Sequence, residues 1–299
     1  MAQAVKPRVR KWSLRGRRAK PLVRVFRFLS IVPTRDLAVL LGFVPGISSY
    51  TYGLSGAMYF SDEVSGCEIR VTPYFLSDDL VVETCAPAER VWEVLEQIAR
   101  VLINYVLAIR AHLEHAEWAR MRRHVVTGYY ALEAERAILT ELLDVAGPDA
   151  SLMESIARLL PLIHDLNVKL PPGTATLQDL RKHKVTGYVE LSTIIGDYLV
   201  DASYEAHSYT LRMELRPLSN QENWSMTMMV YIGDDTVSRV IELLRPVPPS
   251  RLEHILSNWC TIARRALELI KSNIKKKGPL MGNVELFSRA LEKACSAST

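Results

Sequence analysis

Two kinds of hydrophobic periodicity divide this chain of 299 residues into strands and helices. Between residues 52 and 85, apolar side chains alternate with polar ones, a pattern that predicts an antiparallel meander. Pro87 then begins a helical pattern that runs to Arg123. Apolar side chains occupy more than one face of this helix from Val91 to Ile109. We therefore expect a second subunit to cover part of it, which makes the protein a homo-oligomer.

The second half of the chain repeats this plan. Four alternating segments predict strands, at 185–191, 198–204, 210–215 and 224–232. Helical patterns predict a short helix at Val237–Leu244 and a long amphipathic one at Arg251–Lys277. Each half is therefore expected to be a small antiparallel sheet with long helices, which is an α+β fold.

Further helices are expected at 130–145, at 151–167 with a bend at Pro161, and at 285–294. The proline-rich segment 169–174 predicts a linker between the halves. These patterns predict three parts: a basic arm at 1–34, a sheet with long helices at 35–168, and a second sheet with helices at 175–299.

The net charge of +4 is unevenly distributed. Residues 1–27 hold ten basic and no acidic side chains, so the remaining 27 basic and 33 acidic residues carry −6. Such a segment is expected to be an arm that only an anionic partner orders, most often nucleic acid through its phosphates. Deletion of residues 1–27 is expected to remove most of this binding and to leave the fold intact. The expected contacts are Lys6, Arg8, Arg10, Lys11, Trp12, Arg15, Arg17, Arg18, Lys20, Arg24 and Arg27.

Two smaller basic clusters extend this interpretation. They are Arg120, Arg122 and Arg123, and Arg181, Lys182 and Lys184. Each precedes or overlaps a copy of the pattern basic-His-x-Val-Thr-Gly-Tyr, at 123–129 and 182–188. On one face they would lengthen a phosphate-binding track. The competing interpretation of the first cluster is that it complements the negative end of a helix.

A targeting or membrane role of the basic segment fits the residues less well. Arg24 and Arg27 interrupt the apolar stretch that a secretory signal needs, and Pro7 and Pro21 interrupt the amphipathic helix of an organellar presequence. The apolar run Val101–Ile109 is far shorter than the ~20 residues of a membrane span. The expected location is intracellular, or within a nucleoprotein particle.

The cysteine and histidine spacing predicts neither a metal nor a cofactor. The four cysteines form no Cys-x-x-Cys pair. Cys67 and Cys85 lie in neighbouring predicted strands, which leaves a disulfide between them open. His112 and His115 are interpreted as solvated residues of one helix. The ratio of 26 Arg to 11 Lys leans towards a thermophilic source.

These patterns favour a non-enzymatic structural protein that coats or packages DNA or RNA and associates with itself. Dinucleotide, P-loop and serine-hydrolase motifs are absent from the sequence. One alternative is a transcription regulator, because residues 35–50 resemble a helix-turn-helix with a second helix at 47–52. Another is an enzyme localised on nucleic acid, with acid/base groups among the strand carboxylates Glu68, Glu83, Glu190 and Glu214.

Overall fold

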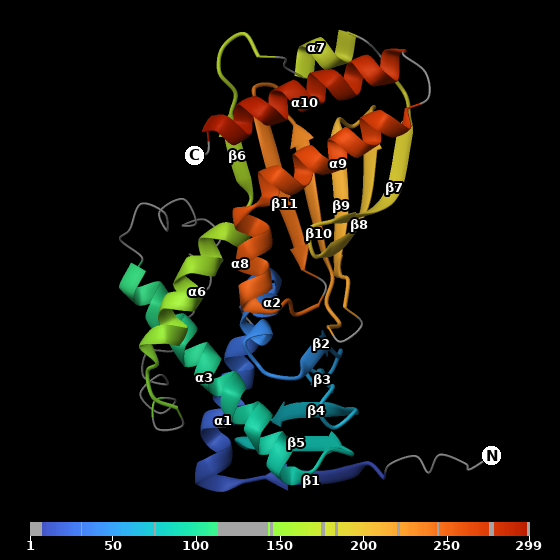
Figure 1. Cartoon of the computed structure of the whole chain (residues 1–299). Coiled ribbons are helices and arrows are strands. Elements are labelled where there is room, and N and C mark those ends of the chain that lie inside the picture. Colours follow the sequence, from blue (N-terminus) through green and yellow to red (C-terminus); the bar gives the residue numbers. More distant parts are fainter. Residues whose placement is uncertain are drawn as a thin grey trace, which may run out of the picture. The chain divides into compact units, whose positions relative to one another are not determined.

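The computed structural model describes residues 8–30, 32–74, 76–112, 143, 146–174, 177–182, 185–219, 222–243, 245–274 and 278–297. The chain forms two compact units, each built on one antiparallel sheet (Figure 1). Unit 1 comprises residues 1–161 and 245–249, and unit 2 comprises residues 162–244 and 250–299. The predicted α+β class, with helices beside two antiparallel sheets, is confirmed.

Unit 1 contains a five-stranded sheet in the order β1-β5-β4-β3-β2. Its strands are β1 (Arg10–Leu14), β2 (Ile47–Tyr52), β3 (Met58–Asp62), β4 (Cys67–Tyr74) and β5 (Asp79–Thr84). Its helices are η1 (Gly16–Arg18), α1 (Ala19–Leu29), α2 (Thr34–Gly42), α3 (Ala88–His112) and α6 (Ala150–Ile163), which ends just inside unit 2. Helices α1 and α3 lie on one side of the sheet (Figure 1), and the side chains of the opposite face are partly exposed to solvent.

The basic segment is part of this fold and not a separate arm, which corrects the prediction for residues 10–29. Strand β1 pairs with β5. The apolar residues of α1 lie on one face of the helix and are buried, while its cations lie on the opposite face. Phe26 packs edge-to-face on Phe60 of β3 at 6.2 Å between ring centroids. Pro21 lies in the first turn of α1, where its missing N–H costs no helical hydrogen bond. Deletion of residues 1–27 would therefore remove an edge strand and part of the core.

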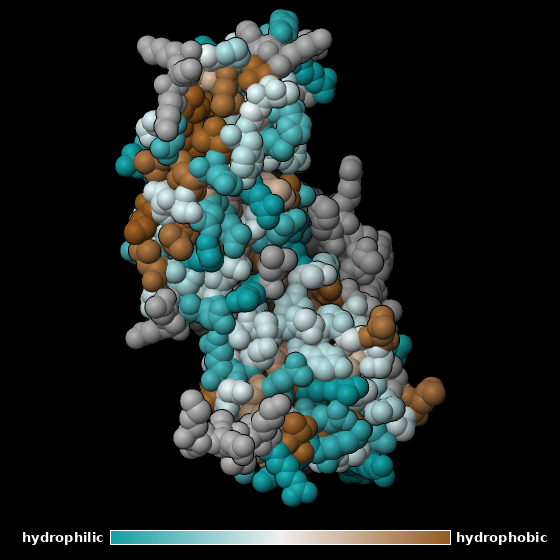
Figure 2. Space-filling model, turned by 90° about the vertical axis from the view of Figure 1, so that its right-hand side faces the viewer, coloured by the Kyte–Doolittle hydropathy of each residue, from teal (hydrophilic) through white to brown (hydrophobic). Residues whose placement is uncertain are grey.

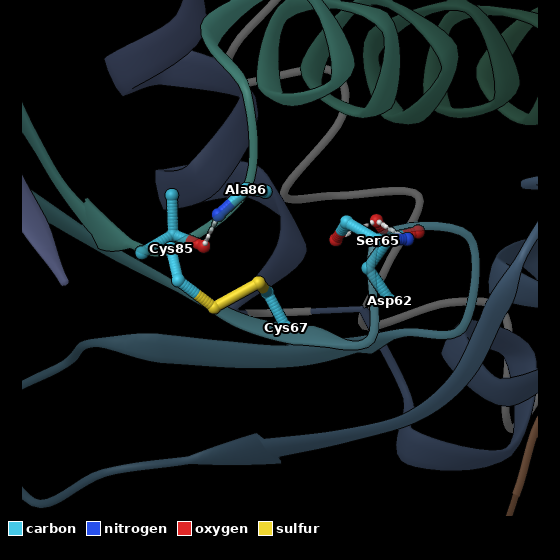
Figure 3. The surroundings of a disulfide bond; sticks show 6 residues. Asp62, Ser65, Cys67, Cys85 and Ala86 are labelled. Carbon is cyan, nitrogen blue, oxygen red and sulfur yellow. Dashed lines mark hydrogen bonds between the residues drawn. A yellow bond between two sulfur atoms is a disulfide. The ribbon is translucent and has the colours of Figure 1, made fainter. Parts of the chain in front are cut away.

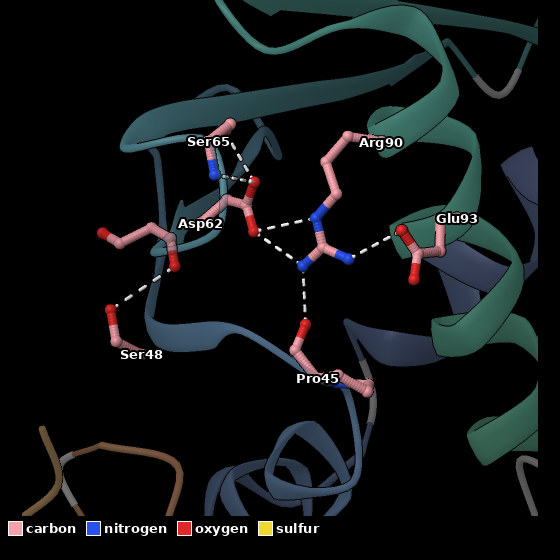
Figure 4. Close-up of polar contacts among 7 residues, drawn as sticks. Pro45, Ser48, Asp62, Ser65, Arg90 and Glu93 are labelled. Atoms are coloured by element: carbon pink, nitrogen blue, oxygen red, sulfur yellow. Dashed lines mark hydrogen bonds and ion pairs between the residues drawn. The ribbon is translucent and has the colours of Figure 1, made fainter. Parts of the chain in front are cut away.

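A buried ion pair holds α3 against β3 (Figure 4). Both Arg90 Nε and Nη2 donate to Asp62 Oδ1, at 3.0 and 2.7 Å, and Nη2 also donates to the Pro45 carbonyl at 2.6 Å. Burial by itself would raise the pKa of Asp62, but hydrogen bonds from Arg90 and Ser65 outweigh burial and lower it. Gly46, with a φ of +79°, lets the chain pass close to this guanidinium. The pair therefore fixes the start of the long helix.

Both units contain a disulfide. Cys67 of β4 is bonded to Cys85, just after β5, with a Cα–Cα distance of 5.6 Å (Figure 3). In unit 2, Cys260 is bonded to Cys295 with a Cα–Cα distance of 5.9 Å. The sequence permits the first bond, because adjacent strands can bring two cysteines together. The second bond joins helices whose packing the sequence does not predict.

Unit 2 contains a six-stranded sheet in the order β6-β11-β10-β9-β8-β7. Its strands are β6 (Leu166–Lys169), β7 (Tyr188–Ile195), β8 (Tyr198–Glu205), β9 (Thr210–Pro217), β10 (Met226–Ile232) and β11 (Thr236–Leu243). Its helices are α7 (Leu177–Lys182), α8 (Pro249–Ser257), α9 (Trp259–Asn273) and α10 (Pro279–Ala297). Helices α9 and α10 cover one face of the sheet (Figure 1), where Tyr204 meets Phe287 at 5.2 Å between ring centroids.

Several elements predicted after residue 150 are corrected. Val237–Leu244 is not a helix, because residues 236–243 form β11 between β6 and β10. The long helix predicted from Arg251 is broken at Asn258 into α8 and α9. The helix predicted at 151–167 ends at Ile163, and the residues after it form edge strand β6. The boundary between the units therefore lies before β6, whereas the sequence indicated residues 169–174.

Two features expected of α3 and of residues 47–52 also differ in the structure. Residues 47–52 form strand β2, so the second helix of a helix-turn-helix does not form there. In α3, the apolar residues from Val91 to Ile109 that were expected to need a second subunit are buried within the single chain, apart from the half-buried Trp92 and Leu107. The homo-oligomer stays a prediction without that support. The predicted continuation to Arg123 and the helix at 130–145 lie almost entirely outside the described residues.

Candidate nucleic-acid interface

Strand β1 is an edge strand, and it places the N-terminal cations on a folded surface. Alternation along the strand puts Lys11 and Ser13 on the uncovered face of the sheet, with Arg15 directly after the strand. Trp12 pairs with Val82 and lies on the helix-covered face. The fold therefore fixes the spacing of charges that the sequence left undefined.

Six cations with exposed or half-exposed side chains lie along β1, η1 and the start of α1 or directly beside them. We call them the basic edge: Arg8, Arg10, Lys11, Arg15, Arg17 and Lys20. Lys11 Nζ lies 2.6 Å from Glu83 Oε1, and Arg15 Nε lies 3.8 Å from Asp79 Oδ2. Among the described residues the other four cations have no ion-pair partner. The basic edge therefore holds six positive charges against two paired carboxylates.

Glu83 is the centre of a charge network on the uncovered face of the sheet. It binds Lys11 on one side and Arg70 on the other, with Arg70 Nη1 at 2.9 Å from Glu83 Oε2. The hydrogen bond from Lys11 lowers the pKa of Glu83, and Arg70 lowers it further against the opposing effect of burial. Arg70 also lies over the ring of Tyr59, 5.4 Å from its centroid. The network keeps two cations and an aromatic ring in fixed places.

A hollow of about 470 Å³ opens beside this network on the same face. Its lining includes two small side chains, Ser13 of β1 and Val81 of β5, which lie opposite one another. Two residues along the strands, about 7 Å away on each side, run rows of longer side chains. On one side lies the row of Lys11, Glu83 and Arg70, of which Lys11 lines the hollow. On the other side lie Arg15, Asp79 and Tyr74, all of which line it. We call this hollow the trough.

On the side of the molecule that Figure 2 shows, the surface of unit 1 is mostly hydrophilic. In Figure 2, the lower part lies at the height of β1, β4 and β5 in Figure 1, and hydrophilic residues dominate it with a few protruding hydrophobic ones. Tyr74 is among the exposed large residues of this unit, with 51% of its surface accessible.

The remaining predicted contacts are not part of the basic edge. Arg24 and Arg27 lie further along α1 and interact within the chain. Arg181 and Lys182 belong to α7 in unit 2, where Lys182 pairs with Asp179 at 2.9 Å. The other predicted contacts, Lys6, Arg120, Arg122, Arg123, Lys184 and the side chain of Arg18, lie outside the described residues.

The carboxylates considered for catalysis separate into two groups. Glu190 and Glu214 line a second hollow, of about 660 Å³, on the sheet of unit 2 together with Asp201. Each has a partner: Tyr188 donates to Glu190 at 2.9 Å, Arg216 pairs with Asp201, and Arg216 Nε lies 3.9 Å from Glu214. Glu68 and Glu83 lie on the sheet of unit 1. The hollow of unit 2 therefore collects carboxylates that already have partners.

Arg70 and Tyr74 are possible nucleic-acid contacts that the sequence alone does not identify. Period-two alternation places both on the uncovered face of β4, but only the pairing of β1 with β5 brings them beside the basic edge. In the described part of the chain, no group of three or more His, Cys, Asp or Glu side chains is placed to hold a metal ion. Within that part, no helix has both the length and the hydropathy of a membrane span.

Comparison of the chain with protein families, with curated proteins and with solved structures finds no match.

Proposed function

We propose that the protein binds nucleic acid through phosphate contacts made by the basic edge of unit 1. The observation that carries this proposal is the set of four cations, Arg8, Arg10, Arg17 and Lys20, that lack an ion-pair partner among the described residues. Unpaired cations held at fixed spacing on a folded surface are suited to neutralising consecutive phosphates. Lys11 and Arg15 add two more cations that a phosphate can share with their carboxylates.

Edge protection is the competing role for these charges, because cations on an edge strand prevent pairing with another sheet. It accounts for Arg10 and Lys11, which lie in β1. It does not account for Arg17 and Lys20, which lie in η1 and α1 beyond the edge. The continuation of the charge past the strand favours a binding role.

Phosphate contacts supply affinity with little sequence specificity, as a coating or packaging protein requires. Such a role also needs self-association, which we propose as its second component. Sedimentation of nucleic-acid-free protein in high salt checks this component, because salt removes a polyanion and strengthens apolar association. A monomer at all micromolar concentrations would exclude coating and leave binding alone.

The binding experiment compares the wild-type chain with a variant that carries Arg8→Gln, Arg10→Gln, Arg17→Gln and Lys20→Gln. The control removes four exposed or half-exposed cations from the helices of unit 2 through Arg264→Gln, Lys271→Gln, Arg289→Gln and Lys293→Gln. Both variants change the net charge equally, so a difference between them reports location. Circular dichroism confirms that each is folded.

Wild-type affinity is expected to fall by about 10²- to 10³-fold between 50 and 200 mM salt if four to six phosphates are neutralised. The slope of log affinity against log salt should decrease by about four in the basic-edge variant and stay unchanged in the control. Equal losses in both variants, or no loss in either, would show that the basic edge is not the binding surface.

A further inference from the structure

We infer that the trough on the sheet of unit 1 receives an unpaired nucleobase, so that the protein prefers single-stranded nucleic acid to a duplex. This inference rests on the proposed function, because Lys11 and Arg15 belong to the basic edge and also border the trough. A strand bound along β1 by its phosphates would direct bases onto the adjoining sheet face.

The shape of the trough follows from the side chains in its three rows. Ser13 and Val81 are small, whereas Lys11 on one side and Arg15, Asp79 and Tyr74 on the other have longer side chains. The resulting volume of about 470 Å³ lies within the range of about 300–1,000 Å³ that small-molecule sites occupy. A single base with part of its sugar fits such a space, and a stacked base pair inside a duplex cannot enter it.

Tyr74 supplies the aromatic surface that base stacking requires. Its side chain lines the trough, and 51% of the residue is exposed. Its hydroxyl makes no hydrogen bond within the described part of the chain, so the fold does not use this hydroxyl there. Stacking of a base on an aromatic side chain contributes about 1–3 kcal/mol by alanine substitution and tolerates any base.

The polar groups of the trough complement the rest of a nucleotide. Lys11 and Arg15 lie at opposite walls and are suited to phosphates on either side of a stacked base. The Ser13 and Ser77 hydroxyls and the Asp79 carboxylate line the same space and offer both donors and acceptors to a base edge. Cations, an exposed ring and hydroxyls on one sheet face are the combination that single-strand binders use.

Duplex binding is disfavoured by the same geometry. The major groove admits a helix or a two-stranded ribbon. The trough instead lies across three adjacent strands of a five-stranded sheet, which is too broad for that groove. A duplex is left with the phosphate contacts of the basic edge alone.

The test measures binding of an oligothymidylate of about 12 nucleotides, a length within the site size of single-strand binders, and of a duplex of the same length, at one salt concentration. Three variants are compared with the wild type: Tyr74→Ala, Tyr74→Phe, which keeps the ring, and Tyr231→Ala, which removes an exposed tyrosine from the sheet of unit 2. Both positions are exposed, so the fold is expected to be retained in all three variants.

The wild type is expected to bind the single strand more tightly than the duplex. Tyr74→Ala should weaken single-strand binding about 5- to 150-fold and leave duplex binding unchanged, while the other two variants behave as the wild type. Equal binding of both probes, with no effect of Tyr74→Ala, would overturn this inference and leave the phosphate proposal standing. Binding of neither probe by the wild type would instead overturn the proposed function itself.

Discussion

The uncovered sheet faces of the two units carry opposite arrangements of charge. In unit 1, one carboxylate, Glu83, lies between two cations, Lys11 and Arg70. In unit 2, one cation, Arg216, lies between two carboxylates, Asp201 and Glu214. The same layered plan therefore carries a carboxylate between two cations on one face and a cation between two carboxylates on the other. Architecture alone says little about function, and the order of charges within these networks is what distinguishes the two faces.

The buried pair of unit 1 and the exposed pair of unit 2 should differ most in their contribution to stability. Arg90→Met leaves Asp62 charged and buried, and is expected to cost about 3–5 kcal/mol. Arg216→Met removes a pair whose side chains are 43% and 35% exposed, and is expected to cost about 1 kcal/mol or less. Hydrogen exchange resolved by segment measures each unit separately. Comparable losses in both would contradict the assigned burial.

The dependence of stability on pH tests whether the charge of Asp62 causes the larger loss in unit 1. The pKa of Asp62 is lowered from 3.8 in the folded state, so its stabilising effect is present above that value and is lost as the pH falls through the lowered folded pKa. Urea unfolding between about pH 5 and 2 should therefore show a steeper acid loss in unit 1 of the wild type than in an Asp62→Asn variant. Parallel curves would mean that Asp62 does not contribute through its charge.

The two disulfides should contribute similarly, with a small advantage for unit 2. They close loops with sequence separations of 18 and 35 residues. The chain-entropy relation then gives a stabilisation of about 3 kcal/mol from Cys67–Cys85 and of about 4 kcal/mol from Cys260–Cys295. Paired Cys→Ser variants, measured by hydrogen exchange in each unit, test this order. A loss confined to the shorter loop would show that loop closure is not the source of the stabilisation.

The smallest expected effect concerns the binding surface directly. Glu83→Gln frees Lys11 and Arg70 from their shared carboxylate and should tighten nucleic-acid binding about two- to fivefold, the scale of an exposed ion pair. Glu214→Gln on the sheet of unit 2 is the matched control and should leave binding unchanged. Fluorescence titration at fixed low salt measures both. Weaker binding after Glu83→Gln would place the phosphate contacts elsewhere.

Elements with a local hydrophobic pattern could be predicted from the chain alone. Alternation marked β3, β4 and β5 as a meander, and helical periodicity after Pro87 marked α3, because a strand or helix face repeats every two or 3.6 residues whatever lies across from it. The α+β class followed from the order of these elements. The basic segment was also evident from composition, and with it the expectation of an anionic partner.

The basic segment forms β1 and α1 through tertiary contacts, and no local sequence pattern indicates those contacts. Cations obscured the inward face of α1 and the pairing of β1, since an edge strand has one neighbour and tolerates charge on both faces. The same limit hid β11, where the buried Ser238 and Arg239 lie among apolar residues and obscure the alternation. The trough needs the register of three strands at once, and register is a long-range property. Residues far apart in sequence, such as Ser13 and Tyr74, line the same hollow only once those strands have paired.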